Sequence, residues 1–484
     1  MRPVLLFLLL LVAAPRLTAQ DVRVSRGIKL TNKASDFFVL GKTSAGFVVQ
    51  RSGKRTYLDL HGTDLRTIRT TEVKLPKRAE LRYVLVDYDG GHVIHLESAD
   101  RATVVKVRQM DARLRIRDEA RVLDTITDPL QSVMANLRYT ASMNRTMHMF
   151  FTPEFGPGGL QHFTASVYDD GLVHQRTWRI SAEQIDDRRF LYAEVTNDGD
   201  AVLIFGRNTT RSGGDDKWDD LLGFSLRQRG GQRPFAIVSR LPLFNRPRFE
   251  IDNVNDRLIM AGLFETPDGG RRPGAGSVGT IVHDLETGEF VHKGSWDLTA
   301  GLMRDLTGSE PDGAVQLFTF RIADIVPRMD GGALVVAESF YTETRNEFMP
   351  SVFMGPTMND YRSRTVYHFN DLLLFEMEPS GRLDYARMVR KRQESEEDRG
   401  LYSSFFLHNH LDALEMAFSE DISSDATFTG VEVDTLHAID RRALFNLTTY
   451  DVRPIPRMAH QTAVNEWIMP ALDGRDLHLV KLLY

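Results

Sequence analysis

The feature that most constrains this sequence is a repeated pattern of two short strands joined by a turn. Each copy places Asn, Asp, Gly, Ser or Pro just before a run of mostly apolar residues. That order is typical of a β-hairpin whose second strand is deeply buried, because turn residues allow the tight bend and apolar residues provide the buried surface. Eight such copies occur, at 36–53, 83–100, 139–155, 192–208, 249–265, 323–340, 404–421 and 458–474.

Two further strands follow most of these copies. Their apolar alternation is weaker and more charged, as expected of outer strands. Four strands repeating at roughly 50 residues predict an all-β fold, a β-propeller of about eight four-stranded blades. Seven blades would result if two copies belonged together, and a pair of β-sandwiches is the competing interpretation. The outer strands are clearest at 56–73, 103–123, 279–298, 371–391 and 428–450.

The two ends of the chain predict how such a ring closes. After Glu466 there is room for two strands but not for a further one. The segment 22–31 is a lone strand that precedes the first full copy. We therefore expect this N-terminal strand to pair with His478–Tyr484 as the outer strand of the last blade, which leaves no exposed edge there.

The start of the chain indicates export. Arg2 precedes an unbroken apolar run from Val4 to Ala14, and the small residue Ala19 closes a polar stretch. This pattern predicts a signal peptide at 1–19, because the apolar run is about half the length that spans a bilayer. We expect a single β-propeller domain over 20–484, exported to the periplasm or the cell exterior, with no transmembrane anchor in the mature chain. With no Cys in the sequence, that domain must be stabilised by burial without disulfides.

Three segments depart from the repeat. The Gly/Pro-rich stretch 265–279 predicts a surface loop. The Met- and aromatic-rich stretch 346–364 predicts a long loop that packs on a neighbouring blade, with a functional lid as the alternative. The charge run 390–400 is interpreted as a solvated linker between the sixth and seventh copies.

No familiar catalytic motif is present. The sequence contains no Gly-x-Ser-x-Gly elbow, no P-loop, no dinucleotide fingerprint and no His-Glu-x-x-His. The absence of Cys also excludes thiolate nucleophiles and thiolate-bound metal. The catalytic residues are therefore unknown at this point, and we predict no cofactor and no metal site.

Two features come closest to a metal site. His408 and His410 would face the same side of a strand, so a metal is conceivable only if His460 or a carboxylate converges on them. The preferred interpretation is that they are polar turn residues. The acidic cluster at 215–220 lacks the ligand spacing of a calcium-binding loop, and we interpret it as a solvated loop anchored by Trp218.

In propeller enzymes the first strand of each blade lines a central channel, where charged side chains do the chemistry. Glycoside hydrolysis needs two carboxylates roughly 5–10 Å apart with opposed pKa values. Polar residues on inner strands are also what a water-filled channel requires for solubility alone. The candidates are Asp87, Glu194, Glu250, Asp252, Arg321, Asp324 and His460.

One stretch resembles a known group of sequences. An Asn-Asp pair opens an apolar strand in 367–375, a Gly turn leads to an aromatic residue in 381–385, and a basic-x-Gln ending follows in 389–393. This arrangement is similar to a segment of uncharacterised secreted proteins of Bacteroidetes, with Tyr385 where those proteins commonly carry Trp. The resemblance implies an exported protein of a Gram-negative bacterium with no assigned activity.

Charge narrows the choice of partner. Sixty basic and sixty-six acidic side chains give a formal charge of −6, which argues against a nucleic-acid partner. The sequence favours a non-enzymatic binding or scaffold module for an unknown protein or glycan ligand. The alternative is a propeller-type glycoside hydrolase or lyase that uses channel carboxylates.

Overall fold

A computed structural model provides the structure of the protein. It describes residues 21–30, 36–100, 102–156, 159–208, 218–237, 243, 246–265, 275–298, 304, 319–349, 360–411, 413–422 and 426–484. The predicted signal peptide at 1–19 lies outside the described residues, as does the middle of each predicted insertion.

The described chain is all-β and forms eight antiparallel sheets. In seven of them, four strands that follow one another in sequence pair in that order. The first sheet contains β3 (Asp36–Thr43), β4 (Gly46–Ser52), β5 (Thr56–His61) and β6 (Thr67–Glu72). The second contains β7 (Ala79–Asp87), β8 (Gly90–Ala99), β9 (Ala102–Asp111) and β10 (Arg121–Ile126). The third contains β11 (Arg138–Ala141), β12 (Met147–Gly156), β13 (Gly159–Asp169) and β14 (His174–Ser181).

The next four sheets repeat this connectivity. The fourth contains β15 (Arg189–Val195), β16 (Ala201–Asn208), β17 (Trp218–Arg227) and β18 (Gly231–Ile237). The fifth contains β19 (Arg248–Asp252), β20 (Arg257–Glu265), β21 (Ala275–Asp284) and β22 (Phe290–Asp297). The sixth contains β23 (Phe320–Pro327), β24 (Ala333–Met349), β25 (Asp360–Met377) and β26 (Leu383–Glu396). The seventh contains β27 (Phe406–Asn409), β28 (Ala413–Ser419), β29 (Thr427–Asp434) and β30 (Ile439–Asn446).

The eighth sheet joins the two ends of the described chain. Its strands are β32 (His460–Ala463), β33 (Glu466–Asp473), β34 (Asp476–Leu483), the short β31 (Arg453–Pro454), β1 (Asp21–Val24) and β2 (Ile28–Lys29). β1 runs antiparallel to β34, with Asp21 opposite Leu483 and Val24 opposite Val480. The predicted pairing of the N-terminal strand with the last strand is confirmed.

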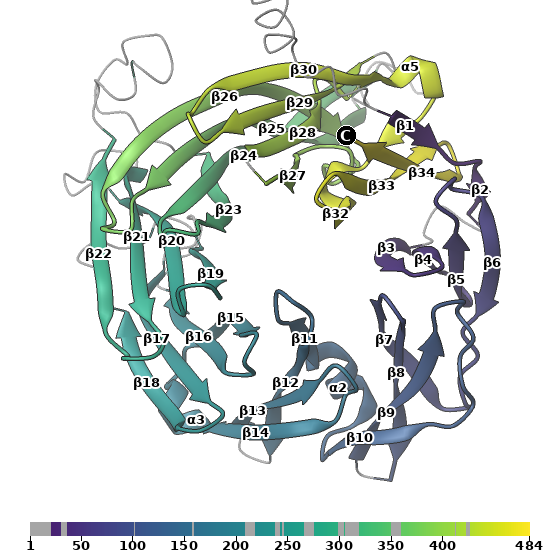
Figure 1. The fold of residues 1–484 in the computed structure, drawn as a ribbon, viewed down its shortest axis with the longest axis vertical. Coiled ribbons are helices and arrows are strands. Elements are labelled where there is room, and N and C mark those ends of the chain that lie inside the picture. The colour runs from purple at the N-terminus through teal and green to yellow at the C-terminus, as the bar shows by residue number, and fades with distance from the viewer. Residues whose placement is uncertain are drawn as a thin grey trace, which may run out of the picture.

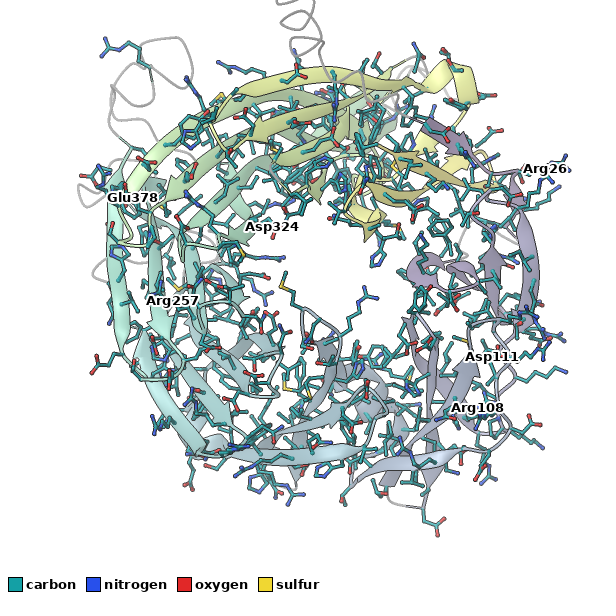
Figure 2. All side chains as sticks on the ribbon, viewed as in Figure 1. Arg26, Arg108, Asp111, Arg257, Asp324 and Glu378 are labelled. Atoms are coloured by element: carbon teal, nitrogen blue, oxygen red, sulfur yellow. The ribbon has the colours of Figure 1, made fainter. Side chains whose placement is uncertain are left out.

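The eight sheets follow one another around a common axis, and the first strand of each of the first seven sheets, like β32 of the eighth, lies nearest that axis (Figure 1). Asp324 on β23 lies at the inner rim, whereas Glu378 lies at the outer rim (Figure 2). Short helices occur only between strands of the described chain, as α2 (Leu130–Asn136), α3 (Ala182–Ile185), α5 (Leu447–Tyr450) and the 3₁₀ turn η1 (Pro456–Met458). Within the described ranges, none of the helices has the length and apolar character needed to cross a membrane.

Apolar side chains pack between each sheet and the next. In β24, Val335 contributes to the cluster shared with the fifth sheet, and its neighbour Val336 contributes to the cluster shared with the seventh. Both side chains are fully buried, because successive residues of a strand point to opposite faces. Such double-sided burial explains why the second strand of each unit is a nearly continuous apolar run.

The same packing connects the last sheet to the first. Phe37 and Phe47 of the first sheet share a buried cluster with Ile468 and Leu479 of the eighth. Val22 and Val24 of β1 pack against the cluster between the seventh and eighth sheets. The N-terminal segment is therefore tied to the end of the chain by backbone pairing and by apolar contact.

A glycine shows how the predicted turns work. Gly46 opens β4 with a φ of +145°, and a Cβ atom there would lie 2.0 Å from the carbonyl oxygen of His61. Because only glycine lacks that atom, the residue allows β4 and β5 to approach at the end of their pairing.

Two predictions for the sixth unit are corrected. The charge run 390–400 is not a solvated linker, because β26 continues to Glu396 and every second side chain turns inward. Lys391, Gln393 and Ser395 are buried. The stretch 346–364 is not simply a long loop, because β24 and β25 remain paired out to Met349 and Asp360. The charges in 390–400 suggested a solvated segment, but successive side chains of a strand point to opposite faces, so only every second one reaches solvent.

We expect deletion of residues 21–30 to lower the free energy of unfolding by about 3 kcal/mol, since Val22, Val24 and Leu30 lose their apolar contacts. Urea denaturation followed by circular dichroism measures the change. Arg23→Ala is the matched control on the same strand, and its effect should stay within about 0.5 kcal/mol because the side chain is exposed. An unchanged denaturation midpoint for the deletion would contradict the stabilising role of this strand.

Candidate functional site

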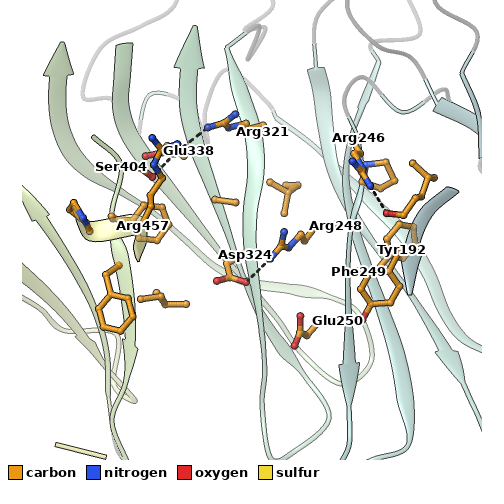
Figure 3. A pocket seen from close by; sticks show the side chains of 18 residues that line it. Tyr192, Arg246, Arg248, Phe249, Glu250, Arg321, Asp324, Glu338, Ser404 and Arg457 are labelled. Atoms are coloured by element: carbon orange, nitrogen blue, oxygen red, sulfur yellow. Dashed lines mark hydrogen bonds and ion pairs between the residues drawn. The ribbon is translucent and has the colours of Figure 1, made fainter. Parts of the chain in front are cut away.

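A cavity of about 1110 Å³ opens beside the inner strands of four consecutive sheets and a turn that precedes the inner strand of the eighth. β15, β19, β23, β27 and the turn η1 each contribute side chains to its lining (Figure 3). Because these strands are the first of their sheets, the polar side chains that they carry come together near the axis. Polar and charged side chains from distant parts of the chain therefore line the same cavity.

Four arginines line this cavity, namely Arg246, Arg248, Arg321 and Arg457. Arg248 lies 3.9 Å from the carboxylate of Asp324. Arg246 donates to the carbonyl oxygen of Leu191, as Figure 3 shows. A backbone carbonyl satisfies a donor but does not cancel its charge, so Arg246 keeps a full positive charge at the cavity wall.

Arg457 is held in a similar way at the opposite side of the cavity. Its guanidinium donates to the carbonyl oxygen of Gly400 and lies 5.0 Å from the centre of the Phe369 ring. Burial lowers the pKa of Arg457, and the neighbouring positive charge of Arg321 lowers it further. Among the described residues neither Arg246 nor Arg457 forms an ion pair.

Three carboxyl groups lie close together on neighbouring inner strands. Glu194 on β15 accepts a hydrogen bond from the Tyr192 hydroxyl. Burial raises the pKa of Glu250 on β19 to about 8, and the charges of Glu194 and Asp324 add to that rise. Burial also raises the pKa of Asp324, whereas Arg248 opposes the shift. At neutral pH Glu250 is therefore mostly protonated and can donate a proton.

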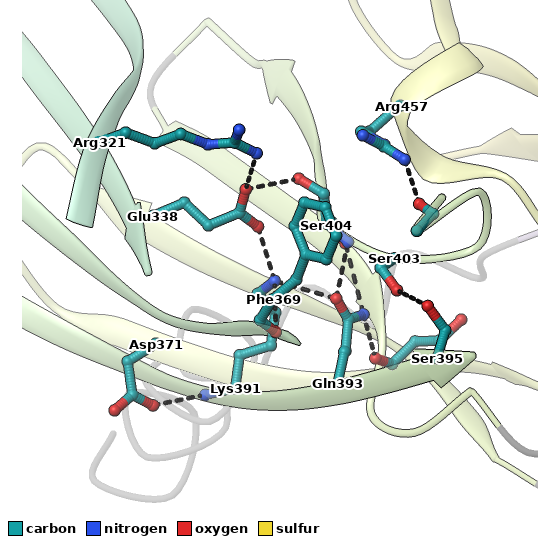
Figure 4. A network of polar contacts seen from close by, with 12 residues as sticks. Arg321, Glu338, Phe369, Asp371, Lys391, Gln393, Ser395, Ser403, Ser404 and Arg457 are labelled. Atoms are coloured by element: carbon teal, nitrogen blue, oxygen red, sulfur yellow. Dashed lines mark hydrogen bonds and ion pairs between the residues drawn. The ribbon is translucent and has the colours of Figure 1, made fainter. Parts of the chain in front are cut away.

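Arg321 is oriented by a buried network behind the cavity (Figure 4). Its guanidinium lies 3.8 Å from Glu338, whose side chain is 2% exposed. Glu338 also accepts hydrogen bonds from Lys391 at 2.8 Å and from the Ser404 hydroxyl at 2.9 Å. Gln393 completes the network by accepting from Lys391 at 3.0 Å and from the Ser404 backbone at 2.7 Å.

This network joins the sixth and seventh units. Lys391 and Gln393 come from β26, and Ser404 comes from the segment before β27. Removal of one partner of a buried ion pair costs about 3–5 kcal/mol, because it leaves an uncompensated charge. The position of Glu338, and through it the position of Arg321, is consequently held firmly.

Apolar surface complements the charges. Phe405, Phe406 and Leu407 at the start of the seventh unit line the cavity and are only partly buried. Aromatic faces next to arginines can bind the apolar faces of sugar rings or other flat groups. The cavity therefore offers both cationic donors and hydrophobic contact.

Three of the predicted channel residues, Glu250, Arg321 and Asp324, line the cavity together. Glu194 lies beside them and acts on Glu250 through its charge. Asp252 does not contribute, because it is buried at the end of β19, where its carboxylate accepts from the backbone of Val254 in the following turn.

The other two predicted channel residues lie elsewhere. Asp87 is exposed at the end of β7, where it accepts from the backbone of Gly90. His460 lies 3.2 Å from Arg145, and burial with that positive charge lowers its pKa to about 4. A neutral His460 accepts a hydrogen bond from Arg145 and belongs to no carboxylate cluster.

Four charged residues of the lining were not among the candidates predicted from the sequence. Arg248 could have been found, because it precedes Glu250 by two positions on one strand and must share its face. Arg246 and Arg457 lie outside the strand repeat, so no periodicity pointed to them. Glu338 lies within an apolar run on a second strand, so its sequence position did not indicate that it would line the cavity.

The two predicted metal candidates have different outcomes. His408 is not a turn residue, because it lies within β27 and is fully buried. Glu415, directly opposite on β28, supplies the converging carboxylate that the sequence could not locate. Residues 215–217 lie outside the described residues, while Asp220 pairs with Arg188 at 2.7 Å. The fully buried Glu415 meets both His408 and His410.

Comparisons with known proteins find similarity at the level of structure. No family model and no curated protein sequence matches the chain. A protein from Lactobacillus plantarum is 13% identical with a TM-score of 0.38, covering 88% of this chain and 96% of that one. Prolyl oligopeptidase B from Galerina marginata is 9% identical with a TM-score of 0.41, covering 93% of this chain and 55% of that one. A protein of unknown function from Bacteroides caccae is 12% identical with a TM-score of 0.27, covering 55% of this chain and 83% of that one.

These neighbours include one named peptidase and a bacterial protein of unknown function. Their identities assign no activity to this chain. They are not restricted to Bacteroidetes, so the resemblance to secreted proteins of that group stays a prediction.

The protonation of Glu250 predicts a pH dependence. A pKa raised from 4.5 to about 8 means that the folded state binds the proton more tightly than the unfolded state. The contribution of Glu250 therefore makes the protein less stable as pH rises from about 4.5 to about 8, by about 1.4 kcal/mol per pH unit. Glu250→Gln, which mimics the protonated form, should gain stability relative to wild type over that window.

Urea denaturation at pH 5 and pH 8 measures the difference in free energy of unfolding between wild type and Glu250→Gln. The contributions of the other titrating groups are common to both proteins and cancel in this difference. Glu80→Gln on β7 is the matched control, since Glu80 is exposed. A difference between wild type and Glu250→Gln that does not change with pH would contradict a protonated Glu250.

Proposed function

We propose that the protein is an exported, closed eight-bladed β-propeller that binds an anionic oligosaccharide in the arginine-lined cavity. The observation that carries the proposal is the excess of positive charge around that cavity. Two of its four arginines bond to backbone carbonyls, so their charges remain available to a ligand.

The charges favour an anion over a neutral or cationic ligand. Asp324 lies beside Arg248, and Glu338 is neutralised by Lys391 from behind. Glu250 carries little charge at neutral pH, because its pKa is about 8. Guanidinium groups bind carboxylates and sulfates through paired hydrogen bonds. A ligand carboxylate between Arg321 and Arg457 would also relieve the repulsion between these two cations.

The size and lining favour an oligosaccharide over a small ion. A volume of about 1110 Å³ exceeds the range of roughly 300–1,000 Å³ that holds most small ligands. Phe405 and Phe406 add aromatic surface at one end, where a sugar ring can pack. A uronic acid oligomer combines these features in one ligand.

Two further elements of the proposal concern the fold and the destination of the chain. Closure of the ring is supported by the pairing of β1 with β34 and by the apolar cluster between the first and last sheets. Export is supported by the signal-peptide pattern of residues 1–19. A closed ring held by burial suits an exported chain that has no Cys.

Binding of a galacturonic acid trimer, measured by isothermal titration calorimetry, tests the proposal. We expect the double variant Arg321→Gln/Arg457→Gln to lose at least 10-fold in affinity, since each charge-assisted hydrogen bond contributes about 1.5–3 kcal/mol. Arg233→Gln is the matched control, because Arg233 is exposed on the outer strand β18. Affinity should also fall as salt concentration rises.

A neutral glucose trimer completes this experiment. Equal binding of the neutral and acidic trimers, or unchanged binding by the double variant, would overturn the proposed anion site. Circular dichroism melting of each variant establishes that it remains folded.

Hydrolysis or eliminative cleavage of the same ligand is the second candidate function. It is favoured by one observation, the protonated Glu250 close to the carboxylate of Asp324, which Arg248 accompanies. Two carboxyl groups with different protonation states can serve as general acid and as base or nucleophile.

If the cavity is catalytic, Glu250→Gln should abolish cleavage of polygalacturonate and keep its binding, because glutamine cannot donate an acidic proton. Release of reducing or unsaturated ends measures the reaction, and activity should decline as pH rises above about 8. Glu80→Gln should leave it unchanged. Absence of cleavage by wild type, or cleavage that survives Glu250→Gln, would reject this second candidate.

A further inference from the structure

The hairpin that begins the seventh sheet brings three ligand-type side chains together, away from the cavity carboxylates. His408 on β27 lies directly opposite Glu415 on β28. His410 follows two residues later and turns to the same side, so that the two imidazole centres are 4.0 Å apart. The ligand atoms of the three residues all lie within 4.8 Å of one another.

The geometry of this group is close to that of a bound metal. His408 Nδ1 and His410 Nε2 each lie 3.7 Å from Glu415 Oε2. Ligands of a tetrahedral Zn²⁺ at about 2.1 Å would stand about 3.4 Å apart. Both imidazole–carboxylate distances are therefore within about 0.3 Å of that spacing, and the two imidazole nitrogens lie within 4.8 Å of each other.

Several imidazole nitrogens of this group lack a hydrogen bond, since the Glu415 carboxylate stands 3.7 Å from His408 Nδ1 and from His410 Nε2. Both ring nitrogens of His408 and the Nε2 atom of His410 are buried and make no hydrogen bond within the described part of the chain. The His408 and Glu415 side chains are 0% exposed, and His410 is 14% exposed. Unsatisfied buried polar atoms are costly, and a metal ion would satisfy them.

We propose that His408, His410 and Glu415 form a binding site for a divalent transition-metal ion, with Zn²⁺ as the expected ion. Two imidazoles and one carboxylate are borderline ligands that suit Zn²⁺ better than Ca²⁺ or Mg²⁺, which prefer oxygen. The partial exposure of His410 provides the side from which the ion enters.

Outer contacts hold the carboxylate in a ligating orientation. Arg442 donates to Glu415 Oε1 at 3.3 Å, which leaves Oε2 directed toward the imidazoles. The Tyr484 hydroxyl donates to Oε2. Such outer contacts orient metal ligands in known sites. Arg442 is in turn paired with Glu432 at 3.1 Å, which weakens its repulsion of a bound cation.

The site lies at the junction between the seventh and eighth sheets. Tyr484, the last residue of the chain, follows β34 and stacks on His408 with ring centres 5.4 Å apart. Val22 and Val24 of β1 pack against the apolar cluster of the same junction. A metal held by the seventh sheet and braced by Tyr484 would stabilise the seam where the two chain ends meet.

A second cluster in the structure is a weaker candidate. Glu376, Asp384 and His437 are also within reach of a common ion. Its groups already satisfy one another, since His437 Nε2 lies 2.5 Å from Glu376 and Arg328 pairs with the same carboxylate. This cluster supplies a useful control.

The test uses ZnCl₂ with protein first stripped of metal by a chelator. Isothermal titration calorimetry should show one Zn²⁺ per chain, and melting followed by circular dichroism should shift upward when Zn²⁺ is added. His410→Ala should lose at least about 100-fold in Zn²⁺ affinity, because loss of an outer contact alone costs 10–100-fold. His437→Ala should bind like wild type.

The visible absorption of bound Co²⁺ reports on metal coordination directly, whereas melting reports only on folding. Co²⁺ bound to wild type should give the visible absorption bands of a tetrahedral site, and His410→Ala should lose them while melting like wild type in chelator. His408→Asn is the second ligand variant and should behave in the same way. Absence of Zn²⁺ binding by wild type, retention of binding by both ligand variants, or its loss in His437→Ala would overturn the proposal.

Discussion

Apolar packing between neighbouring sheets is the interaction on which the other features of this molecule depend. A sheet whose middle strands are apolar on both faces cannot be stable alone, because each face must be covered. Val335 and Val336 illustrate the solution, since they point in opposite directions into the clusters shared with the fifth and seventh sheets. The cluster containing Phe47 and Leu479 extends the same packing from the last sheet to the first. Burial on this scale makes disulfides unnecessary in a chain that has no Cys.

The same packing decides where polar chemistry can gather. The second and third strands of each sheet are committed to burial, so charged side chains accumulate on the first strands, near the axis, and on the outermost strands. Glu250 and Asp324 illustrate the inner position, where burial raises both pKa values. Behind them, the buried pair of Lys391 and Glu338 shows that a charge can enter the packed layer when its partner and several hydrogen bonds accompany it. That pair holds Arg321 toward the cavity.

Sequence periodicity predicted the units and their strands well, because the buried second strand carries a strong apolar signal bounded by turn residues. The pairing of β1 with β34 was predictable for a related reason, since the last unit lacked a strand that the first segment could supply. Part of the cavity lining could also be predicted from the sequence, because Glu250, Arg321 and Asp324 lie on first strands. The run 390–400 was misjudged, since charge indicates solvent only on average and Lys391 has a buried partner 53 positions away.

The sequence by itself determined the number of repeating units, the alternation of their strands and the presence of polar residues on the inner strands. These are local properties, set by turn chemistry and by the two-residue period of a strand. Only the tertiary structure decided which residues meet. Arg246, Arg321 and Arg457 line one cavity, and Glu415 meets His408 and His410 across a hairpin. Such meetings depend on register and on how successive sheets pack, and no single segment of the sequence contains that information.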